Sequence, residues 1–174
     1  VFMGTFISGL NGTNSFSDTD EFIVDQNNET VKMSLGQLKQ HTGDSVNNVD
    51  DLKALNDFNA SVELLGYYEP GDGGGGTFFW DAASDETDNG GTIIQATGVT
   101  TGRWKRVYSG ELNLLWFGAK TDGTSIHTAF TKAVAAANKG VLRIPHGTYA
   151  QSANTHITGA SEITIIGDNA TIAH

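Results

Sequence analysis

The sequence has no cysteine and little positive charge. Without cysteine there is no disulfide bond and no metal site built from thiolates, although this absence names no compartment. The 10 lysines and arginines face 20 acidic residues, which gives a formal net charge of −10. Such a chain repels the phosphates of nucleic acid and an anionic membrane surface. We therefore expect no nucleic-acid partner.

Apolar residues are also scarce, at 38% of 174 residues. No apolar run approaches the ~20 residues that a membrane-spanning helix needs, so we expect no membrane insertion. Glycine is abundant instead, with 22 residues, which favours many turns and short strands over one large helical core. The chain starts at Val1 and stops at His174 within a strand-like pattern. We expect it to be part of a longer protein.

Residues 1–44 predict a small α+β module that follows a polar, loop-rich arm. Short strands at 21–25 and 29–33 are separated by residues that include two asparagines, which tolerate a tight hairpin turn. Ser34 and Gln37 have the spacing of a helix capping box, so a short helix over 35–40 follows.

Residues 45–110 predict a linker helix and an antiparallel β module. Apolar residues recur every third position from Val49 to Phe58, with acids in the first turn. This helix either packs on its own module or forms a neck where several chains meet. The strand pattern recurs at residues 62–65, 78–80, 92–95 and 103–108.

The glycine run Gly73–Gly76 invites comparison with a phosphate-binding loop. That chemistry needs a lysine and a hydroxyl directly after the glycines, at the start of a helix. Here Asp72 precedes the run, and Thr77 and three aromatic residues follow it. The pattern favours a tight loop that feeds a strand.

The loop at residues 81–91 carries four acidic residues. They could bind calcium, or they could simply form a solvated surface loop. The spacing lacks the alternating oxygens and the terminal bidentate acid of a calcium loop, so it favours a solvated loop. Arg103, Lys105 and Arg106 form a basic cluster around Trp104. We expect these cations to pair with the loop acids and to stack on an aromatic ring.

Residues 111–174 predict stacked β rungs behind a capping helix. An apolar strand at 112–117 and a polar turn at 118–125 precede an alanine-rich helix at 128–138. Ser125 is a candidate cap for that helix, and Gly140 a candidate stop. Short strands at 141–145, 161–166 and 170–173 are separated by glycine corners, which is typical of a solenoid. The helix would cover the open end of the solenoid.

The stretch from Trp116 to Ala150 resembles the start of pectate-lyase-like right-handed parallel β-helix domains. The matching positions are Phe117-Gly118-Ala119, Asp122-Gly123, Thr128, and Pro145, Gly147 and Tyr149. The chain departs from that pattern at Thr121, where glycine is usual, and at Ser125 to His127, where an aspartate pair is usual. Those aspartates look like helix caps in the family, so their loss bears on cap strength more than on fold.

Two further stretches resemble parts of bacteriophage tailspikes. Gly66–Asp81 together with Gly102–Val107 is similar to a module that often precedes such a β-helix. Asp18–Leu38 is similar to virion-attachment modules of phage tail proteins. The resemblance implies a mainly β fold with short helices: an attachment module (1–44), a linker helix and β module (45–110), and the first rungs of a right-handed parallel β-helix (111–174).

A tailspike of this type would be a homotrimer in the virion that acts outside the host cell. Its N-terminus would bind phage tail, baseplate or adaptor proteins, and its β-helix would bind, and often cleave, a bacterial surface polysaccharide. The cleaving carboxylates would lie beyond His174. Two alternatives stay open: a secreted pectate-lyase-like enzyme with an accessory module, and a tail adaptor without activity.

Within these residues we predict no catalytic, cofactor or metal site. Asp122 fits a turn or cap residue. His127, His146 and His156 are scattered without the spacing of metal ligands, so exposed histidines are expected.

Overall fold

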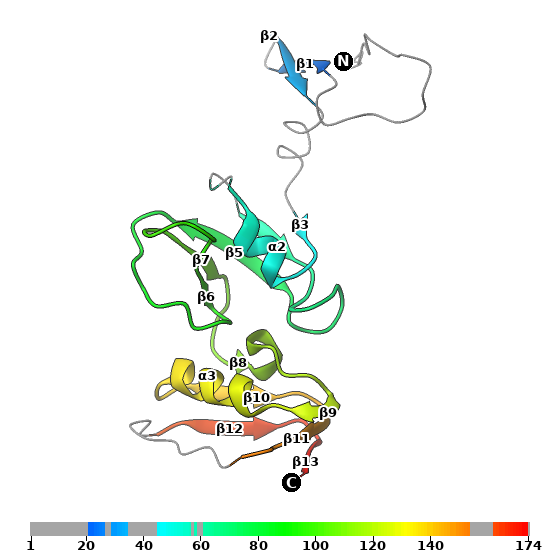
Figure 1. The fold of residues 1–174 in the computed structure, drawn as a ribbon, viewed down its shortest axis with the longest axis vertical. Coiled ribbons are helices and arrows are strands. Elements are labelled where there is room, and N and C mark those ends of the chain that lie inside the picture. The colour runs from blue at the N-terminus through cyan, green and yellow to red at the C-terminus, as the bar shows by residue number, and fades with distance from the viewer. Residues whose placement is uncertain are drawn as a thin grey trace. The chain divides into compact units, whose positions relative to one another are not determined.

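The structure is a computed structural model that divides into two compact units, residues 1–44 and 45–174 (Figure 1). It describes residues 21–26, 29–34, 45–56, 58, 61–153 and 162–173. The predicted N-terminal arm and the predicted helix at 35–40 lie outside these residues. No helix in the described ranges is both long enough and apolar enough to cross a membrane.

The first unit contains the predicted hairpin. Strands β1 (Glu21–Gln26) and β2 (Glu29–Ser34) pair antiparallel, from Glu21 opposite Ser34 to Gln26 opposite Glu29. The two residues between the strands lie outside the described part of the chain.

The second unit begins with a five-stranded sheet of order β3-β4-β5-β7-β6. Its strands are β3 (Ser45–Val46), β4 (Val62–Leu64), β5 (Gly76–Asp81), β6 (Ile93–Ile94) and β7 (Arg103–Arg106). Strands β4, β5, β7 and β6 are antiparallel, as predicted, whereas β3 runs parallel to β4. Strand β3 was not predicted, because two residues carry no periodic signal.

Helix α2 (Val49–Ala54) connects the parallel strands β3 and β4. The Asn48 side chain accepts a hydrogen bond from Asp51 N at 2.9 Å and caps the helix. The helix ends at Ala54, before the predicted end at Phe58, because Leu55 is extended and the Lys53 carbonyl accepts a bond from Thr97 N. Its buried residues join the core of the sheet, so α2 packs on its own module.

Aromatic rings fill one face of the sheet. Trp104 is buried, and Trp80 lies edge-on to it with ring centroids 5.2 Å apart. Phe58 stacks on Trp80 at 4.1 Å. Gly102 has a φ of 109°, and a Cβ there would lie 2.1 Å from the Trp80 ring. Phe79 points to the opposite face and is exposed, as strand alternation requires.

The remaining strands form the rungs of a parallel β-helix (Figure 1). Each described rung gives one strand to each of two parallel sheets, ordered β12-β10-β8 and β13-β11-β9. The strands are β8 (Leu112–Asn113), β9 (Asp122–Ser125), β10 (Val141–Ile144), β11 (Gly147–Ala150), β12 (Thr164–Gly167) and β13 (Ala170–Ala173). This stacking confirms the predicted β-helix rungs.

Two predictions in the first rung were wrong. The apolar stretch expected to be one strand is a strand only at β8, and then becomes the 3₁₀ helix η1 (Leu114–Phe117). The Asn113 side chain accepts a bond from Leu115 N, and Gly118 ends η1 with a φ of 85°. A short buried apolar run does not distinguish a strand from a helical turn. The polar turn was predicted over residues 118–125, but Asp122–Ser125 form the exposed strand β9. Only the pairing of β9 with β11 identifies it as a strand.

Helix α3 (His127–Ala137) lies against β8 and β10 and buries the predicted alanine-rich face (Figure 1). Its N-cap residue is Ile126, which is buried and makes no side-chain capping bond. The Ser125 hydroxyl accepts a bond from His127 N only at 3.4 Å. The cap is therefore weak, and Ile126 contributes to the core instead.

The Pro145, Gly147 and Tyr149 pattern also has a physical explanation. Tyr149 is fully buried, and its hydroxyl donates to the Pro145 carbonyl at 2.8 Å. A Cβ on Gly147 would lie 2.8 Å from Thr121 Cβ. Glycine at position 147 thus leaves room for Thr121, which stands where the resembling domains carry glycine.

The aromatic cluster makes a prediction about stability. Replacing Trp80 by alanine removes its stacking on Phe58 and its contact with Trp104, so we expect the free energy of unfolding to fall by about 3 kcal/mol. Thermal and urea unfolding of the recombinant chain would measure the loss. Phe79→Ala, on the exposed face, is the matched control and should change the melting temperature little. An equal effect of both substitutions would contradict this account.

Candidate functional site at the junction of the sheet and the β-helix

The most constrained site in the second unit is the junction where the sheet meets the β-helix. Strand β7 ends at Arg106 and β8 begins at Leu112, and η1 packs back against the sheet after this short connection. We call the contacts between the sheet and the segment Leu114–Lys120 the junction. It is built around one arginine.

Arg106 is buried, with 5% of its surface exposed, and bonds to backbone carbonyls. Nε donates to Gly91 O at 3.0 Å, Nη1 to Gly75 O at 2.6 Å and Nη2 to Gly74 O at 2.8 Å. The guanidinium also lies between two rings, 4.6 Å from the centroid of Phe78 and 4.7 Å from that of Trp116. One side chain thus joins a sheet strand, two loops and the first rung of the β-helix.

Burial has the largest effect on the pKa of Arg106. It lowers the pKa of the guanidinium to about 10, while the negative charge of Glu63 acts in the opposite direction. The group therefore remains protonated at neutral pH. Carbonyl dipoles and aromatic faces are the groups in direct contact that compensate its charge.

Glycines allow the loops to approach the junction closely. A Cβ on Gly76 would lie 2.5 Å from Arg106 Nη1, and one on Gly91 would lie 2.5 Å from the Phe117 ring. Gly73 has a φ of 85°, and a Cβ there would lie 2.6 Å from Leu115 Cδ1. The glycine run therefore admits neighbouring side chains, which agrees with the prediction of a tight loop.

Tyrosines extend the junction on either side of Arg106. The Tyr68 hydroxyl donates to Gly118 O at 3.0 Å, and Lys120 Nζ lies 4.5 Å from the centroid of the Tyr68 ring. Tyr108 lies edge-on to Trp116 at 5.7 Å. These contacts hold the first rung to the sheet at several separate points.

Asp72 organises the glycine loop from inside. Its carboxylate accepts backbone bonds from Tyr67 N at 2.9 Å, Tyr68 N at 2.7 Å, Glu69 N at 3.3 Å and Gly74 N at 2.8 Å. Burial opposes ionisation of this carboxyl, but the four N–H donors outweigh burial and hold its pKa below the ordinary value of 3.8. The backbone donors that a phosphate would need are therefore bound to the chain's own carboxylate.

The acidic loop and the basic cluster pair only in part as predicted. Lys105 forms ion pairs with Asp81, at 3.0 Å, and with Glu86. Arg103 and Arg106 are buried and bond to backbone carbonyls instead of the acids, and Arg106 stacks on Phe78 and Trp116 rather than on Trp104. The sequence missed this role because the three carbonyls come from residues up to 32 positions away.

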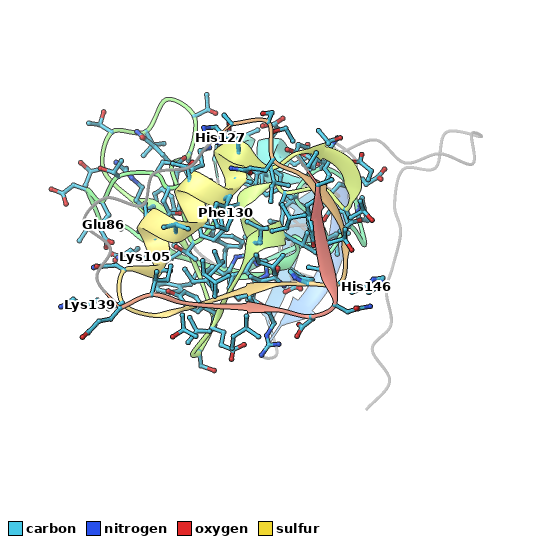
Figure 2. All side chains as sticks on the ribbon, turned by 90° about the horizontal axis from the view of Figure 1, so that it is seen from below. Glu86, Lys105, His127, Phe130, Lys139 and His146 are labelled. Atoms are coloured by element: carbon cyan, nitrogen blue, oxygen red, sulfur yellow. The ribbon has the colours of Figure 1, made fainter. Side chains whose placement is uncertain are left out.

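The candidate histidines do not come together in a site. His127 and His146 lie in separate parts of the molecule in Figure 2, and His156 lies outside the described residues. The Asp122 carboxylate accepts a bond from Thr124 N at 2.9 Å, as expected of a turn residue. Bonds from the Thr124 side chain and backbone hold the pKa of Asp122 below its ordinary value. Within the described ranges, no group of three or more histidines and acids could hold a metal ion.

Comparison with known proteins gives the β module a family. Residues 45–109 match the model of the phage tail protein small four-stranded beta-sheet domain. The four antiparallel strands β4, β5, β6 and β7 all lie in this range.

Solved tailspike structures match a larger part of the chain. The tailspike protein gp49 of Acinetobacter baumannii bacteriophage Fri1, described as a capsular polysaccharide depolymerase, is 26% identical with a TM-score of 0.58, over 72% of this chain and 23% of that one. The tailspike of Acinetobacter baumannii phage AM24 is 26% identical with a TM-score of 0.57, over 72% of this chain and 22% of that one. Pantoea stewartii WceF, a glycan biofilm modifying enzyme with a tailspike-like parallel β-helix, is 22% identical with a TM-score of 0.56, over 87% of this chain and 25% of that one.

Residues 45–109 are thus a phage tail β-sheet domain, and the first rungs of a parallel β-helix follow it. The chain is similar to phage tailspike proteins, as the resemblance implied. The chain spans about a quarter of the length of the solved structures that it matches.

The junction makes a prediction about Arg106. Arg106→Leu leaves three carbonyls, two of them buried, without this donor and removes the cation between two rings, so we expect a loss of about 3 kcal/mol in the free energy of unfolding. Urea unfolding followed by tryptophan fluorescence would measure it. Arg106→Lys should recover only part of the free energy of unfolding that Arg106→Leu loses, because an ammonium group lacks the planar, forked donors of a guanidinium.

Arg143 provides the control for Arg106. It pairs at the surface with Glu111 and Asp168, where solvent screens the charges, so Arg143→Gln should cost much less. Equal losses for the two arginines would contradict the central role of Arg106.

A pH-dependent prediction concerns Asp72. Because its pKa is lowered in the folded state, its ionised form stabilises the fold above the ordinary pKa of 3.8, and that stabilisation is lost as the pH falls through the folded value. Asp72→Asn should destabilise the chain by about 1 kcal/mol near neutral pH, after allowance for solvent screening. The difference from the unsubstituted chain should shrink near pH 3, as measured by urea unfolding at both pH values. Asp85→Asn in the acidic loop is the control, and a difference for Asp72→Asn that stays constant with pH would refute the assignment.

Proposed function

We propose that this chain is the N-terminal part of a homotrimeric tailspike that attaches to the phage particle and carries a polysaccharide-binding β-helix. In this proposal residues 1–44 attach to a tail, baseplate or adaptor protein, residues 45–110 are the connecting module, and residues 111–174 begin the β-helix. The spike acts outside the host cell, on a bacterial surface polysaccharide.

The observation that carries the proposal is the junction. Arg106 bonds to the loops of a phage tail domain and stacks on Trp116 of the first rung. A buried, many-sided joint of this kind keeps the β-helix fixed relative to the sheet. A spike needs such a joint, because the receptor-binding part must keep its orientation on the particle.

The chemistry of the whole protein is proposed from its relatives. The Fri1 spike is described as a capsular polysaccharide depolymerase, and this chain covers only 23% of that protein. We propose that the full-length protein also depolymerises a surface polysaccharide, with carboxylates that lie beyond His174. Asp122 and three acids of the 81–91 loop, Asp81, Glu86 and Asp88, bind backbone or lysine groups of their own module, which supports the proposal that the catalytic groups lie elsewhere.

One experiment tests both the assembly and the activity. We expect the full-length protein to have the mass of a trimer by multi-angle light scattering, and to lower the viscosity of surface polysaccharide from a strain that the phage infects. Residues 1–174 alone should leave the polymer intact.

Three other results would each favour a different account. A monomeric full-length enzyme would favour a secreted polysaccharide enzyme with an accessory module. A trimer that binds no polysaccharide would favour a tail adaptor. Depolymerisation by residues 1–174 alone would show that the chemistry was placed wrongly.

A further inference from the structure

Two hollows meet on the surface beside the junction. One has a volume of about 440 Å³ and is lined by residues that include Tyr68, Glu69, Lys120 and Asp122. The other has a volume of about 350 Å³ and is lined by residues that include His146, Thr148 and Thr171. Thr121 lines both, so the hollows adjoin. We call their combined surface the junction groove.

The β-helix register aligns polar side chains along this groove. Thr148 pairs with Asp122 on β9 and with Thr171 on β13. All three are exposed, and neighbouring strands lie ~4.8 Å apart, so the three side chains form a row across the strands. A row of this kind suits an elongated ligand that runs across the strands.

The walls of the groove are fixed by bonds within the chain. The Tyr68 hydroxyl is bonded to Gly118 O, and Tyr68 N to Asp72. Thr121 packs against Gly147 where a Cβ would not fit. A groove that is already formed costs a ligand little ordering on binding.

The chemistry of the groove selects its ligand. Its β-helix end offers hydroxyl, imidazole and amide groups, from Thr148, Thr171, His146 and Asn169. Such groups both donate and accept hydrogen bonds, as the hydroxyls of a sugar do. A half-exposed tyrosine ring at the other end adds an apolar surface with a polar tip. Lipids and apolar peptides need a mainly apolar groove, which these residues do not provide.

The charges that line the groove restrict the range of ligands further. Glu69 and Asp122 are acidic, Lys120 is the cation of the groove and lies over the Tyr68 ring, and the chain as a whole carries −10. An anionic polymer would be repelled from this surface. We propose that the junction groove binds an uncharged segment of saccharide, as an accessory site apart from the depolymerising centre. This inference rests on the proposed polysaccharide function of the whole spike.

The test uses the full-length protein and a readout local to the groove. The probe is a set of short oligosaccharides from an uncharged O-polysaccharide of a strain that the phage infects. Hydrogen exchange with mass spectrometry should show slower exchange in peptides that cover Lys120–Thr124 and His146–Ala150. A carboxylate-bearing capsular oligosaccharide should give no such protection.

Two variants test the row of side chains. Thr148→Arg places a bulky side chain in the groove, so we expect the affinity reported by this local protection to fall about tenfold or more. Thr164→Arg, at an exposed threonine on β12 in the other sheet, is the matched control and should leave the protection unchanged. A thermal melt of both variants checks that they fold.

The outcomes separate this inference from the proposed function. Protection elsewhere in the spike, with none in the two groove peptides, would overturn the accessory site and leave the proposed function intact. Protection of the groove by the anionic probe alone, or unchanged protection in a folded Thr148→Arg variant, would also overturn it. Absence of any oligosaccharide binding to the full-length protein would overturn both.

Discussion

The burial of the Arg106 cation without an ion pair constrains the second unit more than any other interaction described here. The Arg106 guanidinium is out of water, so its donors need fixed acceptors, and three backbone carbonyls from two loops provide them. Those loops must therefore stay close to strand β7. Phe78 and Trp116 close the two faces of the guanidinium, which makes the position of the first β-helix rung depend on the same side chain.

The glycine loop shows how the same backbone features can serve binding or structure. Backbone N–H groups that converge on one point attract an anion, and phosphate is one such anion. Here Asp72 supplies the anion from within the loop, and Leu115 fills the space that a residue larger than glycine at position 73 would need. The loop is therefore closed to a ligand and is instead part of the joint.

This arrangement fits a connecting part better than a reactive one. The buried cation donates three hydrogen bonds to backbone carbonyls, and the acids at positions 72, 81 and 122 bind backbone or lysine groups of their own module. The surface that remains accessible beside the joint is polar and lies over β-helix strands. The proposed spike would thus combine a rigid connecting module with the proposed saccharide contacts in the adjoining groove.

Local sequence alone determined the elements whose signal is periodic or short-range. The alanine-rich face of α3, the β1–β2 hairpin, the four antiparallel strands and the rung strands β10, β12 and β13 follow from spacing and turn residues, and the motif around Tyr149 pointed to the β-helix. Only the tertiary structure decided the rest. Strands β3 and β9 exist because partner strands pair with them. Leu114–Phe117 is helical because Asn113 and Gly118 cap it. Arg106 bonds to carbonyls far along the chain, whereas the sequence predicted that it would pair with the acids of the 81–91 loop. Pairing, capping and burial of this kind depend on groups that meet only after folding, so a local pattern cannot encode them.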